Sequence, residues 1–249
     1  LDAAVSGDEI WVAAGTYTPT KDQNGNASPA DSRLKLFYIN KNLKIYGGFA
    51  GTESSLANRP KPLAASIIDG DLGTVGVNTD NAYRCVFLYS VSSASVFDGF
   101  TIQNGNANHP SDGIYQRGGG IFTWLSTGNN ISNCTFISNY AGWGGGIACE
   151  FATPIITNCR FLNNTSTNRG GGIFTLQSDA LIYNCTFTGN SSDLGSGIFN
   201  ESSAAQVINC SVVGNTGASG IANFGSTPVI TNTIVWGNSS QIVNFNGTN

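Results

Sequence analysis

The chain has 249 residues, and Gly (32), Asn (29), Ser (26) and Thr (22) make up 109 of them, whereas charged residues account for only 10%. The net charge of −4 excludes a basic surface for nucleic acid or anionic lipid as the main feature, and no apolar run approaches the roughly 18 residues of a membrane span. A hydrophobic share of 40% is too high for a disordered polar tract, so the composition predicts an all-β protein rich in turns.

The first part of the chain carries most of the charge. Residues 1–112 hold 11 acidic and 8 basic residues, and we interpret residues 1–97 as capping coils with long loops. The opening segment Leu1–Val5 is typical of the end of a helix, and since no Met precedes it we expect the sequence to be a piece of a longer protein. A solenoid carries its insertions on one face, often the binding face. Three segments are candidate binding loops: 21–32, 50–66 and 106–117.

Three aspartates in the first part are candidate calcium ligands. Asp69 and Asp71 flank Gly70, and Asp80 follows nine residues later. Carboxylate oxygens at alternating positions can ligate Ca²⁺. The alternative, which we favour, is turn chemistry, because Asp and Gly supply Asx-turns. We therefore predict no firm metal site or cofactor, and Ca²⁺ is the one candidate that stays open.

Two short motifs recur through residues 98–249. Gly-Gly-Gly-Ile ends at residues 121, 147 and 173, and its degraded copies end at 198 and 221, so the Ile positions step by 26, 26, 25 and 23 residues. Between them, an Asn-Cys pair precedes a Phe or Val, and another Asn follows three residues after that. The cysteines are Cys134, Cys159, Cys185 and Cys210, and the later asparagines are Asn139, Asn164, Asn190 and Asn215.

A repeat of about 25 residues is too short for a βαβ unit, which needs about 30, and it has no stretch long enough for a helix. Three short strands joined by turns fit this length. They form one coil of a parallel β-helix, in which coils stack about 4.8 Å apart and equivalent residues form columns. We predict that residues 98–249 are regular coils of one continuous solenoid.

The columns have structural roles in this interpretation. Asn suits tight turns because it tolerates the left-handed conformation, and its amide can bond to the Asn of the next coil. The glycine triplets suit another corner, where positive φ or close packing is needed. Six cysteines would favour disulfides if the chain were secreted, but stacked side chains have parallel Cβ vectors, so we expect buried free thiols in the column. Cys85 and Cys149 fall outside it.

The pairing of Gly-Gly-x-Ile with Phe-x-x-Asn resembles the repeat of the polymorphic outer-membrane proteins, a family of exported right-handed β-helix adhesins. Segments 6–17, 44–53 and 98–102 resemble the opening of large bacterial secreted proteins of the same pectin-lyase-like class, in which a short helix caps the first coils. The resemblance covers nearly the whole chain. It implies a right-handed parallel β-helix, export across the outer membrane by secretion machinery such as type IX, and a secreted or cell-surface location. It leaves the activity open, because the fold hosts lyases, hydrolases and adhesive rods.

The residues for known β-helix catalysis are sparse. A lyase needs a basic Arg or Lys beside carboxylate-bound Ca²⁺, and the regular coils offer Arg160 and Arg169 without an acidic cluster in register. A hydrolase needs closely arrayed carboxylates, and the single His109 lies in Asn-His-Pro. We therefore predict no catalytic residue and a non-enzymatic adhesin or stalk segment. The alternative is a carbohydrate-active enzyme or a glycan-binding module.

Candidate ligand contacts lie in the 106–117 insertion and beside the glycine corner. Trp124 and Trp143 could stack on a sugar, although packing against neighbouring coils is the favoured alternative. The expected partner is a host-surface, glycan or abiotic-surface receptor, and the resemblance adds secretion machinery. The five candidate residues are His109, Asp112, Tyr115, Trp124 and Trp143.

Overall fold

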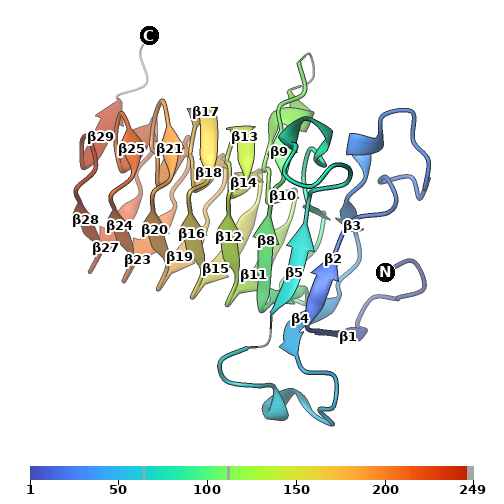
Figure 1. Ribbon diagram of the computed structural model, residues 1–249. Coiled ribbons are helices and arrows are strands. Elements are labelled where there is room, and N and C mark those ends of the chain that lie inside the picture. The colour runs from blue at the N-terminus through green and yellow to red at the C-terminus, as the bar shows by residue number, and fades with distance from the viewer. Residues whose placement is uncertain (64, 111–112, 246–249) are drawn as a thin grey trace.

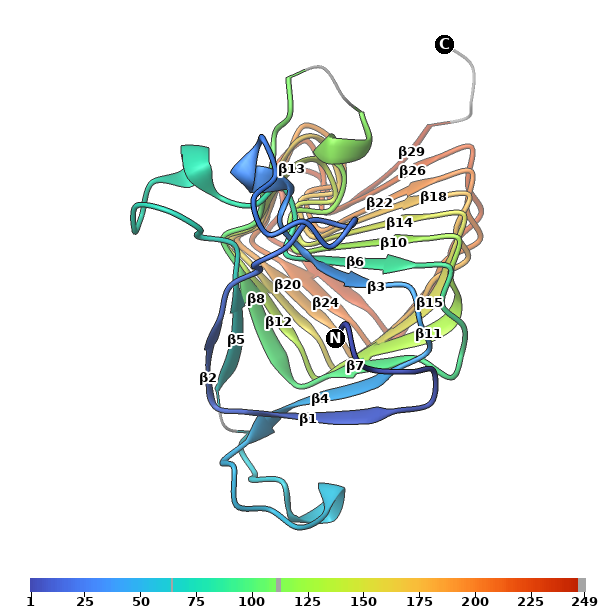
Figure 2. The ribbon, with the colours of Figure 1, turned by 90° about the vertical axis from the view of Figure 1, so that its right-hand side faces the viewer.

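The computed structural model describes residues 1–63, 65–110 and 113–245, and this part of the chain contains strands, short 3₁₀ turns and loops. Each coil adds one strand to each of three parallel sheets of eight strands (Figure 1). Viewed along the axis, the three sheets enclose a three-sided core (Figure 2). The prediction of an all-β parallel β-helix is therefore confirmed.

Sheets A, B and C form the three walls of the solenoid. Sheet A contains β1 (Glu9–Ala13), β4 (Lys44–Phe49), β7 (Val96–Asp98), β11 (Thr127–Ser132), β15 (Thr153–Thr157), β19 (Leu181–Tyr183), β23 (Gln206–Ile208) and β27 (Val229–Thr231). Sheet B contains β2 (Gly15–Tyr17), β5 (Ser66–Asp69), β8 (Phe100–Gln103), β12 (Thr135–Ile137), β16 (Arg160–Leu162), β20 (Thr186–Thr188), β24 (Ser211–Val213) and β28 (Ile234–Trp236). Sheet C contains β3 (Phe37–Ile39), β6 (Val86–Tyr89), β10 (Ile121–Trp124), β14 (Ile147–Glu150), β18 (Ile173–Leu176), β22 (Ile198–Glu201), β26 (Ile221–Phe224) and β29 (Ile242–Phe245).

A fourth short sheet was not predicted. Sheet D lies between sheets B and C and contains β9 (Asn106–Ala107), β13 (Tyr140–Trp143), β17 (Thr165–Arg169), β21 (Ser191–Ser192) and β25 (Thr216–Gly217). The segment after each Phe-x-x-Asn motif is too polar to signal a strand by its hydrophobic pattern. The segment forms a strand because the equivalent segment of the preceding coil lies beside it in register, so their backbones can hydrogen-bond.

The expected helix end at Leu1–Val5 is wrong, and none of the described residues forms the helical cap that the resemblance implied. Residues 1–8 form turns, in which the Ala4 N–H donates to Leu1 O (3.2 Å) and the Asp8 N–H donates to Val5 O (3.1 Å). The four helical elements described are single 3₁₀ turns: η1 (Ser32–Leu34), η2 (Leu56–Asn58), η3 (Asn78–Asp80) and η4 (Ile114–Gln116).

The interior is filled by stacked columns of identical or similar residues. The rings of Phe136, Phe161 and Phe187 lie face to face, with centroids 4.8 and 4.6 Å apart. The Ile column of sheet C is also fully buried from Ile121 to Ile221. Burial of one large apolar side chain contributes about 1.5–3 kcal/mol, so each added coil extends the core by a similar increment.

The corner glycines turn the chain from sheet D into sheet C. The first glycine of each triplet has a positive φ, +59° at Gly118, +68° at Gly144 and +69° at Gly170. L-residues with a side chain rarely adopt this conformation, which explains why glycine recurs there. The expectation of positive φ at this corner is met.

The asparagines divide between two roles that the sequence interpretation had merged. The left-handed conformation belongs to the Asn of the Asn-Cys pair, as at Asn133 (φ +53°) and Asn158 (φ +54°). Asn139, Asn164, Asn190 and Asn215 instead point inward with 0–2% exposure, and each donates its amide N–H to the amide oxygen of the next coil's Asn (2.9–3.0 Å). The inner ladder therefore satisfies polar groups in the core, and the outer Asn series makes the turns.

Candidate functional site

The outer surface of sheet C carries a column of four phenylalanines and two alanines that are almost fully buried. The column runs along the solenoid axis through Phe87, Phe122, Ala148, Phe174, Phe199 and Ala222, with exposures of 0–4%. Outward residues of a sheet are ordinarily solvated, so side chains from elsewhere must cover this column, which we call the aromatic face.

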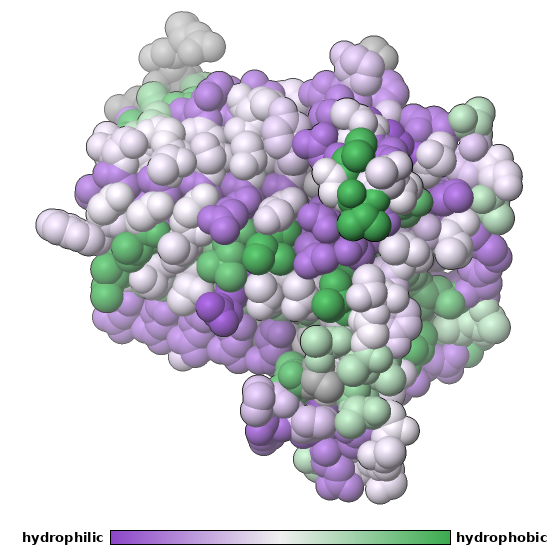
Figure 3. Space-filling view, viewed as in Figure 1, coloured by the Kyte–Doolittle hydropathy of each residue, from purple (hydrophilic) through white to green (hydrophobic). Residues whose placement is uncertain are grey.

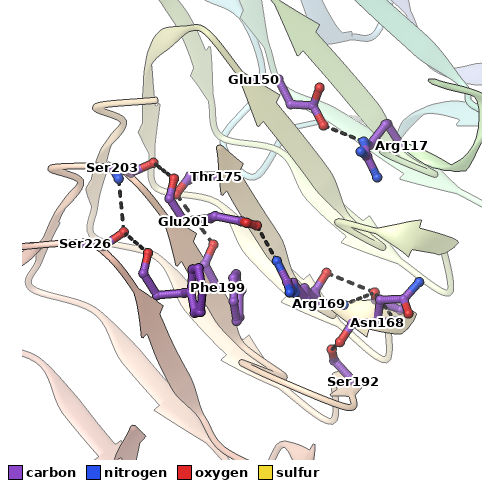
Figure 4. Close-up of polar contacts among 12 residues, drawn as sticks. Arg117, Glu150, Asn168, Arg169, Thr175, Ser192, Phe199, Glu201, Ser203 and Ser226 are labelled. Atoms are coloured by element: carbon purple, nitrogen blue, oxygen red, sulfur yellow. Dashed lines mark hydrogen bonds and ion pairs between the residues drawn. The ribbon is translucent and has the colours of Figure 1, made fainter. Parts of the chain in front are cut away.

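Two arginine–glutamate pairs cover the aromatic face (Figure 4). Arg169 Nη1 lies 2.5 Å from Glu201 Oε2, and its guanidinium lies 5.0 Å from the Phe199 ring centroid. Arg117 forms an ion pair with Glu150 and lies 3.8 Å from the ring centroid of Trp143. Each arginine precedes a corner glycine, and each glutamate ends a sheet C strand, so each pair crosses the face and shields the rings beneath it.

Glu150 is the more buried of the two acids, with 8% exposure. Burial raises the pKa of its carboxyl above the ordinary value of 4.5, and the Arg117 guanidinium acts in the opposite direction without cancelling the effect. The folded protein therefore binds a proton at Glu150 more readily than the unfolded chain does. This group disfavours the folded state progressively as pH rises above 4.5.

Replacing Glu150 with Gln is expected to remove this pH dependence. The free energy of unfolding of the wild type, measured in urea between pH 4 and 7, should decline with rising pH relative to that of E150Q, because only the wild type must ionise the buried carboxyl. Glu201→Gln is the matched control on the same face, in the more exposed pair. A difference between wild type and E150Q that is constant across this range would contradict the assignment.

A second cluster lies at the first coils, where loop 106–117 meets Tyr83 and loop 21–32. The rings of Tyr83, His109 and Tyr115 contact one another, with centroid distances of 5.2, 5.7 and 5.8 Å. Tyr83 donates its hydroxyl hydrogen to Asp31 Oδ2 (2.9 Å), and Arg33 lies 4.1 Å from its ring centroid. We call Tyr83, His109 and Tyr115 the tyrosine cluster.

The tyrosine cluster borders a small hollow of about 40 Å³. Its cationic lining residues are Arg33, Lys35 and Arg84, and Asp22 is the acid among them. The Arg33 guanidinium is held by the backbone oxygens of Asn81 and Asn106, both at 2.7 Å. The hollow can admit a small polar group beside the Tyr115 ring.

The predicted ligand contacts therefore separate into two places. His109 and Tyr115 come together in the tyrosine cluster, whereas Trp124 and Trp143 pack on the aromatic face. Trp143 lies under Arg117, and Trp124 is stacked with Phe122 at 6.2 Å, which is the packing role favoured as the alternative. Asp112 lies outside the described residues.

Several residues of these sites were not singled out from the sequence. Tyr83, Arg84 and Arg33 come from capping coils without a repeat, so no column marked them. Arg117 and Glu150 had a signal, since each holds a fixed place relative to the Gly-Gly-Gly-Ile motif. Arg117 directly precedes one copy of the motif and Glu150 follows the Ile of the next copy by three residues, so the two positions could have been predicted to lie on the same face of sheet C.

The three candidate loops do not share one face, contrary to the expectation for solenoid insertions. Loop 21–32, with η1, and loop 106–117, with η4, lie at the top of Figure 2, whereas loop 50–66 projects from the bottom. Arg59 anchors loop 50–66 on sheet A through an ion pair with Asp98 (2.5 Å). Loop 106–117 supplies His109 and Tyr115 to the tyrosine cluster, and loop 21–32 contacts the cluster through Asp31.

The six cysteines are buried and unpaired in the structure. Cys134, Cys159, Cys185 and Cys210 are stacked from coil to coil, and each directs its thiol toward backbone carbonyls such as Thr157 O (3.3 Å from Cys159 Sγ). Burial raises the pKa of the Cys85, Cys149 and Cys159 thiols, which disfavours the reactive thiolate.

The candidate calcium ligands lie in and beside loop 70–81. Asp69 accepts hydrogen bonds from the Asp71 N–H (3.0 Å) and from the side chains of Gln103 and Asn104 (2.7 and 2.8 Å). Asp71 and Asp80 accept from the backbone N–H groups of Gly76 and Thr74. Among residues 1–63, 65–110 and 113–245, no three His, Cys, Asp or Glu side chains gather closely enough to hold a metal ion by themselves.

Comparison with known proteins gives a family but no individual relative. The sequence model of the family described as the right-handed β-helix region matches residues 65–200, more than half of the chain. No curated protein and no solved structure matches the chain. Within the described residues, no helix is long and apolar enough to cross a membrane.

Proposed function

The chain belongs to the right-handed β-helix family, and from that premise we propose that it is a non-enzymatic segment of an exported surface protein. In this proposal the solenoid is an adhesin or stalk that presents a binding surface at its first coils. The fold alone does not distinguish this role from catalysis, because β-helices host both. The support comes from how the side chains on the outer surface are used.

The observation that carries the proposal is the convergence of loops 21–32 and 106–117 on the tyrosine cluster. His109 and Tyr115 are half-buried, so each offers part of a ring to solvent while its neighbours hold it in place. Preorganised aromatic rings beside a hollow lined by Arg33 and Lys35 suit recognition of a polar ligand such as a glycan.

The aromatic face supports a structural role for the regular coils. Its two acids, Glu150 and Glu201, are each engaged by an arginine that packs on aromatic rings. Sheet B presents a mixed surface, on which small apolar patches are separated by polar residues (Figure 3). Such surfaces suit a stalk, since large exposed apolar patches favour association.

Replacing Tyr115 with Ala is expected to lower the affinity for a bound glycan by about tenfold, because loss of an aromatic contact costs about 1–2 kcal/mol. Ligands would first be identified on a glycan array with the wild-type chain, and affinities then measured by calorimetry. Tyr183→Ala is the matched control, since Tyr183 is exposed on sheet A, away from the loops. Equal losses in the two variants would contradict the assignment of the binding surface.

The alternative is a carbohydrate-active enzyme, and the raised pKa of Glu150 is the observation that favours it, since a general acid needs such a shift. A uronate-release and reducing-sugar assay on the glycans that bind would separate the two functions. Product formation that is lost in Glu150→Gln would overturn the non-enzymatic proposal. Binding without turnover would support lectin-like adhesion.

A further inference from the structure

Loop 70–81 follows β5, contains η3 and folds back onto β9, the first strand of sheet D. The Asn106 side chain donates to Asn78 O (2.6 Å), and the Asn81 side chain donates to Asn104 O (2.7 Å). The Ala82 N–H donates to Gly70 O (2.8 Å), which closes the base of the loop. These contacts hold the loop, which contains Asp71, Asp80 and Asn81, against Asn106 of β9.

Four side-chain oxygens at this place are buried and accept no hydrogen bond from any described residue: Asp71 Oδ1, Asp80 Oδ1, Asn81 Oδ1 and Asn106 Oδ1. Asn81 and Asn106 are only 6% and 4% exposed. A buried acceptor without a donor costs about 1–3 kcal/mol, and more when it is charged. Three of these atoms belong to loop 70–81 and one to β9, and all four are acceptors, which is the pattern that a bound cation would satisfy.

The hydrogen bonds at the loop orient these oxygens. Asp71 Oδ2 accepts from the Gly76 N–H (2.9 Å) and Asp80 Oδ2 accepts from the Thr74 N–H (2.8 Å), so each carboxylate is fixed by one oxygen and keeps the other. The Asn106 amide is directed at η3 by its bond to Asn78 O, and η3 contains Asp80. Asp69 Oδ1 accepts a hydrogen bond from the Asp71 backbone N–H (3.0 Å).

We propose that loop 70–81 binds one Ca²⁺ through Asp71, Asp80, Asn81 and Asn106. Calcium accepts six to eight oxygen ligands, including carboxylates, amide and backbone carbonyl oxygens and water, in adaptable geometry. The carboxylates of Asp71 and Asp80 supply the negative charge, and the amide oxygens of Asn81 and Asn106 are the further oxygen ligands. Arg33, the nearby cation, donates to the backbone oxygens of Asn81 and Asn106 and forms no ion pair with either carboxylate in the described structure.

Such a site would fix the capping coils. It would join the β5–β6 connection to β9, next to the tyrosine cluster, whose Tyr83 follows Asn81 by two residues. Calcium would therefore stabilise the fold at the place where the loops gather, independently of whether the loops bind a glycan.

The test is a calcium titration of the full 249-residue chain. After treatment with EDTA and desalting, calorimetry should show one Ca²⁺ per chain, and Mg²⁺ should bind at least about tenfold more weakly, because it demands stricter octahedral geometry. Adding Ca²⁺ at about 100 times its dissociation constant should raise the melting temperature by about 5 °C. Asp71→Asn and Asp80→Asn should each weaken binding by at least about tenfold.

Asp193→Asn is the matched control. Asp193 is an exposed acid in a late coil, and its replacement changes the net charge by the same amount. It should bind Ca²⁺ like the wild type. Absence of Ca²⁺ binding to the wild type would overturn the proposal, and so would full affinity in both loop variants. Should Asp71→Asn or Asp80→Asn fail to fold, as judged by circular dichroism, Asn106→Ala tests the same site, and unchanged affinity there would also count against it.

Discussion

Replacing Gly171 with Ala is expected to lower the free energy of unfolding by about 3 kcal/mol or more, because the added Cβ meets backbone atoms that cannot move aside. A Cβ at this position would lie 2.5 Å from Ser196 O and 2.6 Å from Ser191 O. Gly171 O also accepts the hydrogen bond of Gly146 N–H (3.1 Å), so a local shift would break the ladder between coils. Urea denaturation followed by far-ultraviolet circular dichroism measures the loss.

Gly113→Ala is the control for this substitution. No atom lies within 4 Å of a Cβ built at Gly113, and its φ of −60° suits any residue. Its free energy of unfolding should change by no more than about 1 kcal/mol, and Ala can even stabilise by restricting the unfolded chain. A small loss at Gly171 that equals the change at Gly113 would show that the corner tolerates a side chain.

Replacing Asn164 with Leu is expected to cost about 4 kcal/mol, because an isosteric apolar residue leaves buried groups without partners. Asn164 Oδ1 accepts from both the backbone N–H (3.1 Å) and the side-chain amide (3.0 Å) of Asn139, and its own amide donates to Phe136 O (2.9 Å). Leu can make none of these bonds. The Asn164 amide also donates to Asn190 Oδ1 (3.0 Å), so the groups that lose a partner lie in both neighbouring coils, and the destabilisation should extend beyond the substituted coil.

The outer Asn series offers the control for the inner ladder. Asn158 is exposed, its φ is +54°, and its amide bond to Asn133 is 3.4 Å long. The Asn184 side-chain amide also donates to Asn158 Oδ1 at 3.4 Å. Asn158→Gly keeps access to the left-handed conformation and removes only these two long, solvated bonds, so we expect a loss of about 1 kcal/mol or less. Denaturation midpoints of the two variants that coincide would refute the distinction between the inner and outer series.

The repeat determined the fold because every regular coil places the same residue types at its turns and in its core. The 25-residue spacing, the glycine triplets and the Asn-Cys pairs each specify a turn or a core position, and stacking then follows from the backbone ladder. For this reason the parallel β-helix and the cysteine column could be derived before any coordinates. The same reasoning assigned the left-handed conformation to Asn139 and its equivalents, because a sequence shows which residue types recur and not which of two neighbouring asparagines faces inward.

The tertiary structure decided what depends on contacts that occur once. Tyr83, His109 and Tyr115 meet because loop 106–117 folds onto the segment that follows η3, and no periodicity links their positions. The aspartates of loop 70–81 were visible as possible ligands, but only the folded loop adds the buried amide oxygens of Asn81 and Asn106. A stacked solenoid repeats its core interactions in every coil, whereas its sites form in the insertions, where the chain path alone determines which side chains come together.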